Sequence, residues 1–156
     1  MPASLRQSKP PQPLKSPFAV LGLDHVVLRV SNTAGMTAFY CEILGCTLER
    51  TNEKMGLIQL RAGSCLIDLV DIKGKIGRGG GAAPGKEGRN MDHFCLRIDG
   101  FDEAALRAYL TGHNVQIGDM GNRYGAEGTG PSLYINDPEG NLLELKGPPG
   151  MIPEGA

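Results

Sequence analysis

The chain has 156 residues, 40% hydrophobic and 21% charged, which is enough apolar material for one packed domain or two small ones that share a core. The net charge is −1 and tryptophan is absent, so no basic, aromatic-rich surface points to nucleic acid. No apolar run reaches membrane-spanning length and the N-terminus lacks the apolar core of a signal peptide, so we expect a cytoplasmic protein without membrane contact. The four cysteines show no C-x-x-C spacing and lie in apolar patterns, which favours buried free thiols over disulfides.

Both ends of the chain have the composition of disordered segments. Residues 1–17 hold five of the 11 prolines and no acidic residue, and these prolines exclude a regular amphipathic helix. The glycine-rich stretch KGKIGRGGGAAPGKEGR in the middle of the chain indicates a flexible linker. The predicted organisation is a disordered tail at 1–20, a first module at 21–72, a linker at 73–89, a second module at 90–147 and a tail at 148–156, with 21–147 forming one domain.

In chain order, the first module begins with a strand, GLDHVVLRV at 22–30, and a helix that stops at Gly45 follows it. The apolar face of this helix is formed by Met36, Phe39, Tyr40, Ile43 and Leu44. Three strand patterns complete the module: TLERTN, LIQLRAG and CLIDLVD.

The second module repeats this order. The segment NMDHFCLRI at 90–98 aligns position for position with 22–30, and Asp102 can cap a helix that ends at Gly112. The strand patterns VQIGDM, SLYIND and LLELKG follow, and we expect a longer loop at 121–130. The repeat predicts an α+β fold in which two βαβββ modules form a curved mixed sheet.

Alternation along the strands separates an apolar face, suited to pack against the helices, from a polar face that the helices leave uncovered. The predicted uncovered face carries His25, Arg29, Asp68, His93, Arg97, Ser132, Tyr134 and Glu144. His25 and His93 occupy equivalent positions of the repeat, as do Asp68 and Glu144, and a pseudo-twofold axis would bring these four residues together. The alternative is the wet side of an antiparallel sheet, but that alternative requires only scattered polar residues. The paired pattern favours a metal site on the concave face.

Asp24 and Asp92 stand directly before the two histidines. Strict alternation points their side chains to the opposite face, so we expect solvated carboxylates at strand ends without contact to the imidazoles.

The two strand-plus-histidine openings, the F-Y-x-x-x-L-G helix end at 39–45 and the closing Y-x-x-D-P-x-G-x-x-x-E at 134–144 resemble the vicinal oxygen chelate superfamily, over about residues 21–147. That superfamily includes glyoxalase I, extradiol dioxygenases and bleomycin-binding proteins. Carried over residue by residue, the resemblance implies that His25, His93 and Glu144 bind one divalent ion. The donors suit Zn, Fe, Mn, Ni or Co, and three protein ligands leave positions for water and substrate.

A fourth ligand of glyoxalase I would fall on Asp68, which is one methylene shorter than the usual residue, so we expect no direct coordination by Asp68. The resemblance implies a metal-dependent enzyme of the lyase or isomerase type that chelates a small substrate through adjacent oxygens and stabilises an enediolate, with Glu144 or Asp68 as catalytic base. Tyr134, Ser132 and Arg123 are candidates for substrate binding. The alternatives are an extradiol-type dioxygenase and a metal-free ligand-binding resistance protein. By analogy with the superfamily we expect a homodimer, with the site either within one chain or shared between subunits.

Overall fold

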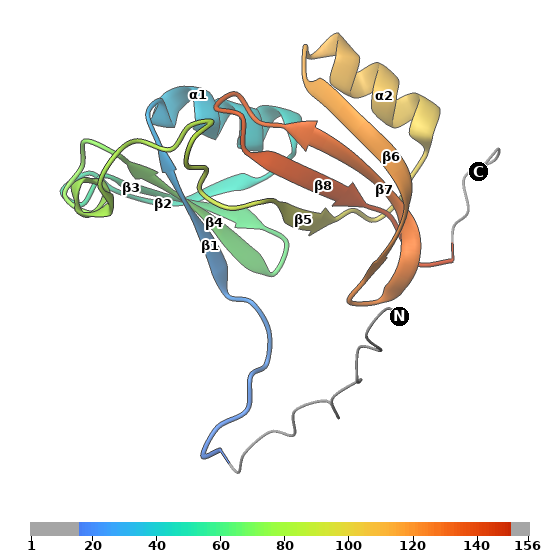
Figure 1. Ribbon diagram of the computed structural model, residues 1–156, viewed down its shortest axis with the longest axis horizontal. Coiled ribbons are helices and arrows are strands. Elements are labelled where there is room, and N and C mark those ends of the chain that lie inside the picture. The colour runs from blue at the N-terminus through green and yellow to red at the C-terminus, as the bar shows by residue number, and fades with distance from the viewer. Residues whose placement is uncertain (1–15, 151–156) are drawn as a thin grey trace, which may run out of the picture.

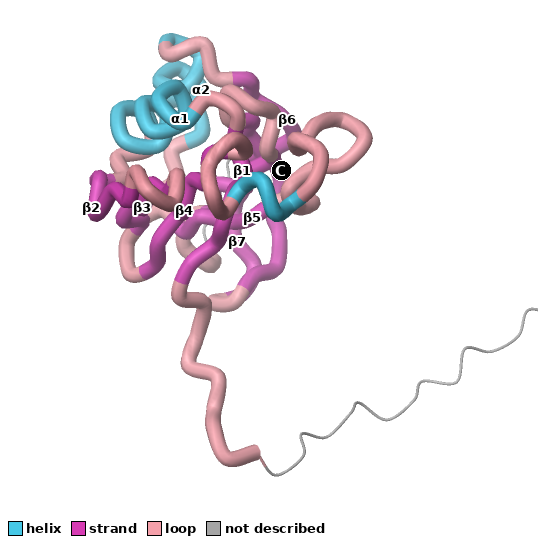
Figure 2. The backbone as a smooth tube through the Cα atoms, turned by 90° about the vertical axis from the view of Figure 1, so that its left-hand side faces the viewer, coloured by secondary structure: helices cyan, strands magenta, loops and turns pink. Residues whose placement is uncertain are grey.

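The structure is a computed structural model that describes residues 16–150. The outer parts of the predicted tails, residues 1–15 and 151–156, lie outside the described residues. Residues 16–24 run away from both sheets (Figures 1 and 2). This arm exposes most of its large apolar side chains, and Leu21 is fully exposed. Within residues 16–150, no helix is long and apolar enough to cross a membrane.

Each half of the chain folds into the predicted order of one strand, a helix and three further strands. The first half contains β1 (His25–Val30), α1 (Thr33–Ala38), η1 (Phe39–Ile43), β2 (Thr47–Asn52), β3 (Leu57–Ala62) and β4 (Cys65–Asp71). A short 3₁₀ turn, η2 (Gly77–Gly80), lies between the halves. The second half contains β5 (Phe94–Arg97), α2 (Glu103–Gly112), β6 (Gln116–Gly125), β7 (Gly128–Asn136) and β8 (Leu142–Lys146).

The strands form two four-stranded mixed sheets with the same topology. Their orders are β1-β4-β3-β2 and β5-β8-β7-β6. In each sheet the first strand of the module pairs in parallel with the last, and the remaining pairs are antiparallel. The predicted α+β fold of two βαβββ modules is therefore confirmed.

Capping side chains set the starts of the two helices, and a glycine marks the turn after the first. The side chain of Asn32 accepts a hydrogen bond from the Gly35 N–H, and Asp102 accepts one from the Ala105 N–H, as the sequence predicts for Asp102. After Ala38 the first helix widens into one π turn, η1, and the chain then turns at Gly45, whose φ of 75° favours glycine.

One hydrophobic core serves both modules. The cluster includes Leu28 and Tyr40 of the first half together with Leu133 and Leu145 of the second. Figure 1 shows α1 over the first sheet and α2 beside β6, with both helices on the same side of the molecule, and Figure 2 agrees. Among residues 16–150, no helix covers the other faces of the two sheets, as strand alternation predicts.

Buried polar contacts also join the modules. The Tyr40 hydroxyl donates to Asp137 Oδ2 at 3.0 Å, and both residues are buried. The side-chain amide of Asn90 accepts from the Arg29 N–H and donates to the Arg29 carbonyl, so it satisfies the free edge of β1, and it also donates to Asn141. These contacts hold the modules in one relative position.

The glycine-rich linker is fastened to the first sheet. The Arg29 guanidinium donates to the carbonyl oxygens of Gly77, Gly80, Gly81 and Ala82 at 2.8 to 3.2 Å. Five N–H donors in a fixed plane suit this clustering of carbonyls. The composition of the linker predicts flexibility, but the hydrogen bonds from Arg29 hold this part of the linker in place.

Two local predictions are wrong. The loop expected at 121–130 is a β-hairpin, because β6 and β7 remain paired as far as Gly125 and Gly128 and only Ala126 and Glu127 form the turn. Glycine-rich composition concealed these strands, since a glycine adds no side chain to an alternating pattern.

The cysteines are free, as predicted, but only Cys46 is buried. Cys95 is exposed because it alternates with the core residues Phe94 and Leu96 and so lies on the uncovered face of β5.

Candidate metal centre

The first sheet places His25 and Asp68 on its uncovered face. His25 opens β1, and Asp68 lies in the neighbouring parallel strand β4, where it pairs with Val27. Asp68 is only 5% exposed, and the Gln59 side-chain amide donates to both of its oxygens at 3.2 and 3.0 Å. Gln59 therefore orients the carboxylate without neutralising it. This contact was not predicted, although the alternation of LIQLRA places Gln59 on the same face.

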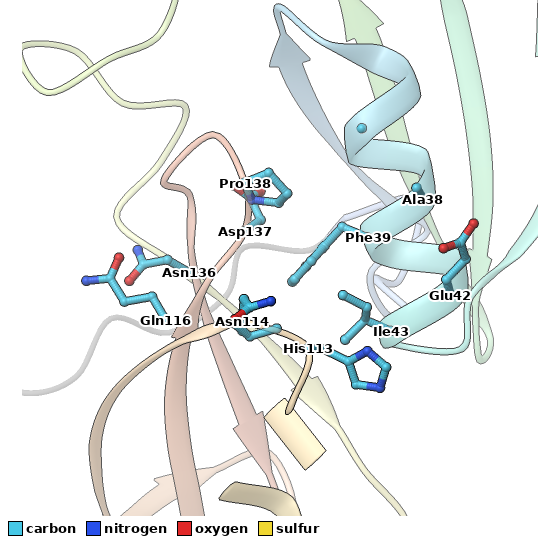
Figure 3. A pocket seen from close by; sticks show the side chains of 12 residues that line it. Ala38, Phe39, Glu42, Ile43, His113, Asn114, Gln116, Asn136, Asp137 and Pro138 are labelled. Carbon is cyan, nitrogen blue, oxygen red and sulfur yellow. The ribbon is translucent and has the colours of Figure 1, made fainter. Parts of the chain in front are cut away.

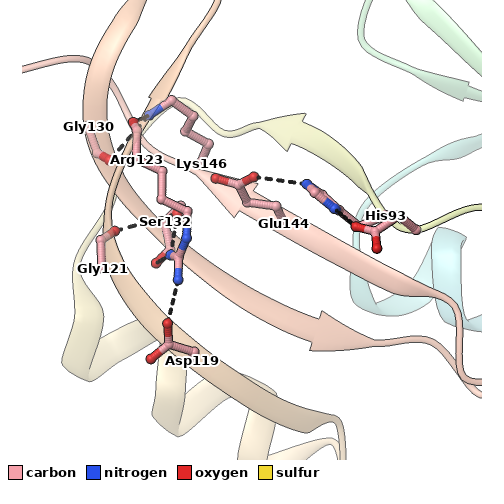
Figure 4. Close-up of polar contacts among 9 residues, drawn as sticks. His93, Asp119, Gly121, Arg123, Gly130, Ser132, Glu144 and Lys146 are labelled. Carbon is pink, nitrogen blue, oxygen red and sulfur yellow. Dashed lines mark hydrogen bonds and ion pairs between the residues drawn. The ribbon is translucent and has the colours of Figure 1, made fainter. Parts of the chain in front are cut away.

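The second sheet places His93 and Glu144 together. The distance from His93 Nε2 to Glu144 Oε2 is 3.6 Å, too long for a hydrogen bond (Figure 4). Glu144 is 6% exposed, and its Oε1 is buried without any hydrogen-bond partner among the described residues. A buried carboxylate oxygen without a donor costs about 1–3 kcal/mol, so this position favours a bound cation.

Both histidines are held by the aspartate that precedes them. The distance from His25 Nδ1 to Asp24 Oδ1 is 2.6 Å, and from His93 Nδ1 to Asp92 Oδ2 it is 2.5 Å. The expectation that these aspartates point away is wrong, because Asp24 precedes the first residue of β1 and Asp92 lies before β5, where strand alternation does not apply.

The two contacts have the same chemical consequence. An aspartate on Nδ1 fixes the tautomer and leaves Nε2 free, which is the usual arrangement of a metal-binding histidine. In the first pair, the hydrogen bond that the His25 imidazole donates to the Asp24 carboxylate is the main reason that the pKa of His25 is raised.

The three candidates for substrate binding gather beside the second pair. The rings of His93 and Tyr134 meet edge to face at 5.3 Å between centroids, and the Arg123 guanidinium lies 4.5 Å from the Tyr134 ring centre. Arg123 Nη1 donates to the Ser132 hydroxyl at 2.7 Å, and its Nη2 donates to Asp119 at 2.5 Å (Figure 4). This network holds the arginine over the sheet on the side where Glu144 lies.

Within one chain the predicted ligands form two half-sites instead of one site. No group of three or more His, Cys, Asp or Glu residues within 16–150 is arranged to hold a metal ion. His25 and His93 do border one apolar groove between the modules, with a volume of about 830 Å³, but Asp68 and Glu144 do not. Imidazole nitrogen and carboxylate oxygen suit a divalent ion, yet each half-site contains only one histidine and one carboxylate of the predicted set.

A second cavity, of about 430 Å³, lies on the helix side. Figure 3 shows Phe39 and Ile43 across from His113 and Asn114, with Asp137 nearby. None of the predicted site residues lines it. We therefore place the candidate centre on the uncovered sheet faces.

Two further residues of the uncovered face were missed. Cys95 pairs in register with Glu144; although part of its side chain is exposed, partial desolvation against the sheet, followed by the negative charge of Glu144, raises the pKa of its thiol to about 11. Lys146 is 5% exposed, and its ammonium group donates to the carbonyl oxygens of Arg123 and Gly130. The patterns FCLR and LLELK already place both residues on the histidine and glutamate face.

A duplicated βαβββ fold with matched histidine and carboxylate pairs on its uncovered faces defines a recognisable class of protein. The model of the glyoxalase/bleomycin resistance protein/dioxygenase superfamily matches residues 22–145, and the chain belongs to that superfamily.

Solved structures share this fold. A protein from the mobile metagenome of V. pseudocholerae is 27% identical, with a TM-score of 0.68 over 83% of this chain and 96% of that one. A virulence protein from Salmonella typhimurium is 25% identical, with a TM-score of 0.68 over 84% and 99%. Lactoylglutathione lyase from Agrobacterium tumefaciens, 19% identical with a TM-score of 0.59 over 89% and 96%, shares the fold.

Proposed function

We propose that this protein is a divalent-metal-dependent enzyme of the lyase or isomerase type that acts on a small substrate with adjacent oxygens. The observation that carries the proposal is the repeated pairing of an aspartate with the Nδ1 of a histidine, next to a carboxylate on the same sheet face. The Oε1 of Glu144, which has no hydrogen-bond partner within the described part of the chain, adds a buried negative charge that a cation would satisfy.

The complete site is formed by two copies of the chain. His25 of one copy joins His93 and Glu144 of the other as the ligands, because a single chain holds these residues in separate half-sites. A twofold dimer would form two such sites, since each copy has one half-site of each kind. The exposed apolar arm at 16–24 supports association, because contiguous exposed apolar residues are typical of interaction surfaces.

The roles of the remaining residues follow from their contacts. When bound, the metal would stabilise negative charge that develops on a substrate oxygen. Asp68 is the preferred base, because Glu144 serves as ligand and Gln59 holds the Asp68 carboxylate in place to remove a proton from the carbon beside a carbonyl. Tyr134, Ser132 and Arg123 line the same face and contact the substrate.

A mixing experiment tests the shared site. His25→Ala and Glu144→Ala proteins, purified separately, each lose every complete site and should bind little metal. After unfolding and refolding together in equal amounts, half of the dimers contain both variants, and each of those has one intact site. The mixture should then hold about one quarter of the wild-type metal per chain, as measured by elemental analysis.

A mixture of His93→Ala and Glu144→Ala, whose changes lie in the same half-site, should recover no metal. Equal metal contents in both mixtures would contradict the shared site, and a wild-type protein that binds no metal would favour a ligand-binding protein instead. Oxygen uptake with catechols in the Fe(II) form would favour the dioxygenase alternative.

A further inference from the structure

A row of cationic side chains crosses the second sheet next to Glu144. In the strand register, Cys95, Glu144 and Tyr134 form one row, and Arg97, Lys146 and Ser132 form the next row on the same face. Successive residues on one face of a strand are about 6.6–6.8 Å apart. The cations therefore lie one pleat away from the proposed ligand.

Lys146 is the most unusual member of this row. It is 5% exposed, yet among residues 16–150 it has no carboxylate partner. Its ammonium group donates to two carbonyl oxygens, from Arg123 and Gly130, and so has one donor left. The β6–β7 hairpin closes over the side chain, since an added Cβ on Gly125 would lie 2.7 Å from Lys146 Cε. A buried cation without a counter-charge is costly, so an anion brought there by a ligand would be favoured.

The two arginines beside Lys146 are only partly neutralised. Arg97 pairs through Nε with Glu127, and Arg123 pairs through Nη2 with Asp119, and both acids are largely exposed. Within the described residues, Arg97 Nη2 and Arg123 Nε make no hydrogen bond. Donors from three strands thus remain free around Lys146.

We propose that Lys146, Arg97 and Arg123 form an anion subsite that selects substrates with a carboxylate or phosphate a few bonds away from their adjacent oxygens. This inference rests on the proposed function, because the adjacent oxygens are held at the metal. The substrate class is then a small acid whose second charged end reaches across one pleat of the sheet. Bidentate arginines and a buried ammonium group suit either anion.

Two ligands that share the same chelating group distinguish binding at this subsite from binding at the metal. 2-Oxoglutarate and 2-oxopentanoate share the 2-oxo acid group, but only the former has a carboxylate at the far end. In calorimetric titrations of the metal-loaded protein, 2-oxoglutarate should bind about tenfold or more tightly. Lys146→Met should reduce this preference to about threefold or less and leave the dissociation constant of 2-oxopentanoate unchanged.

Further variants keep the test decisive. If Lys146→Met does not fold, Arg97→Gln, which changes the partly exposed end of the row, should also lower the preference for 2-oxoglutarate over 2-oxopentanoate. Arg107→Gln, which removes a similarly exposed arginine on α2, should leave it unchanged. Equal, metal-dependent binding of both probes to the wild type would overturn the anion subsite alone. Binding of neither probe in any metal form would overturn the proposed function as well.

Discussion

The hydrogen bond from Tyr40 to Asp137 gives the most direct measure of how the two modules are held together. The Tyr40 hydroxyl is fully buried and its pKa is raised, chiefly by burial, so it stays neutral and donates. The Asp137 carboxylate also accepts from the N–H groups of Glu139 and Asn141 and from the Asn141 side chain. Tyr40→Phe therefore leaves one oxygen with a single donor. Because a buried bond to a charged group contributes about 1.5–3 kcal/mol, we expect a loss of about 2 kcal/mol of unfolding free energy.

Tyr109→Phe is the matched control. Its hydroxyl also spans the two modules, but it is half-exposed and donates to a neutral acceptor, the Ile43 carbonyl, at 2.9 Å. Urea unfolding followed by circular dichroism should show a loss below about 1 kcal/mol for this variant. In thermal unfolding, Tyr40→Phe should lower Tm by about 4–8 °C. Equal losses in the two variants would refute the reasoning that burial and charge make the Tyr40 contact dominant.

Four further predictions concern separate parts of the molecule. Glu139→Gln replaces the carboxylate that accepts hydrogen bonds from the Ser31 and Asn32 N–H groups before α1, and urea unfolding should show a loss of about 1 kcal/mol of unfolding free energy. The matched change at an exposed carboxylate, Glu127→Gln, should cause little loss. Arg29→Met frees the linker carbonyls, so trypsin should cut at Arg78 or Lys86 faster than in wild type, and an unchanged cleavage rate would contradict the role of Arg29. Asp92→Asn should weaken metal affinity by about 10–100-fold in competition with a chelator dye, without changing the sedimentation coefficient. The pKa of the Asp137 carboxyl is raised above 3.8, chiefly by burial, so the folded protein holds the carboxyl proton more tightly than the unfolded chain does. The contribution of Asp137 to stability is therefore greatest at low pH and falls as pH rises through the window above 3.8. This fall should be absent in Asp137→Asn.

The sequence predicted the fold because its signals are redundant. The repeat of 22–30 at 90–98, the capping Asp102 and the alternation around Asp68 and Glu144 each point independently to the same βαβββ unit. The hairpin at 121–130 was missed for the opposite reason, since glycines remove the side chains on which alternation depends.

The candidate site was predictable only as far as single strands allow. Alternation placed His25, His93 and Glu144 on uncovered faces, but the distance between the two half-sites depends on how the modules pack, through contacts such as that of Tyr40 with Asp137. The aspartates on the histidines were missed because the residues before a strand do not obey its period.

The contact of Tyr40 with Asp137 also has a consequence for the two repeats as units. Two separate modules would have to meet by diffusion, so their pairing would weaken on dilution. The linker at 73–89 tethers the modules to each other and supplies an effective concentration that dilution does not change. Arg29 shortens that tether further by gathering its carbonyls against β1. The two modules of this chain are therefore not independent units, and a substitution that destabilises one of them also destabilises the other.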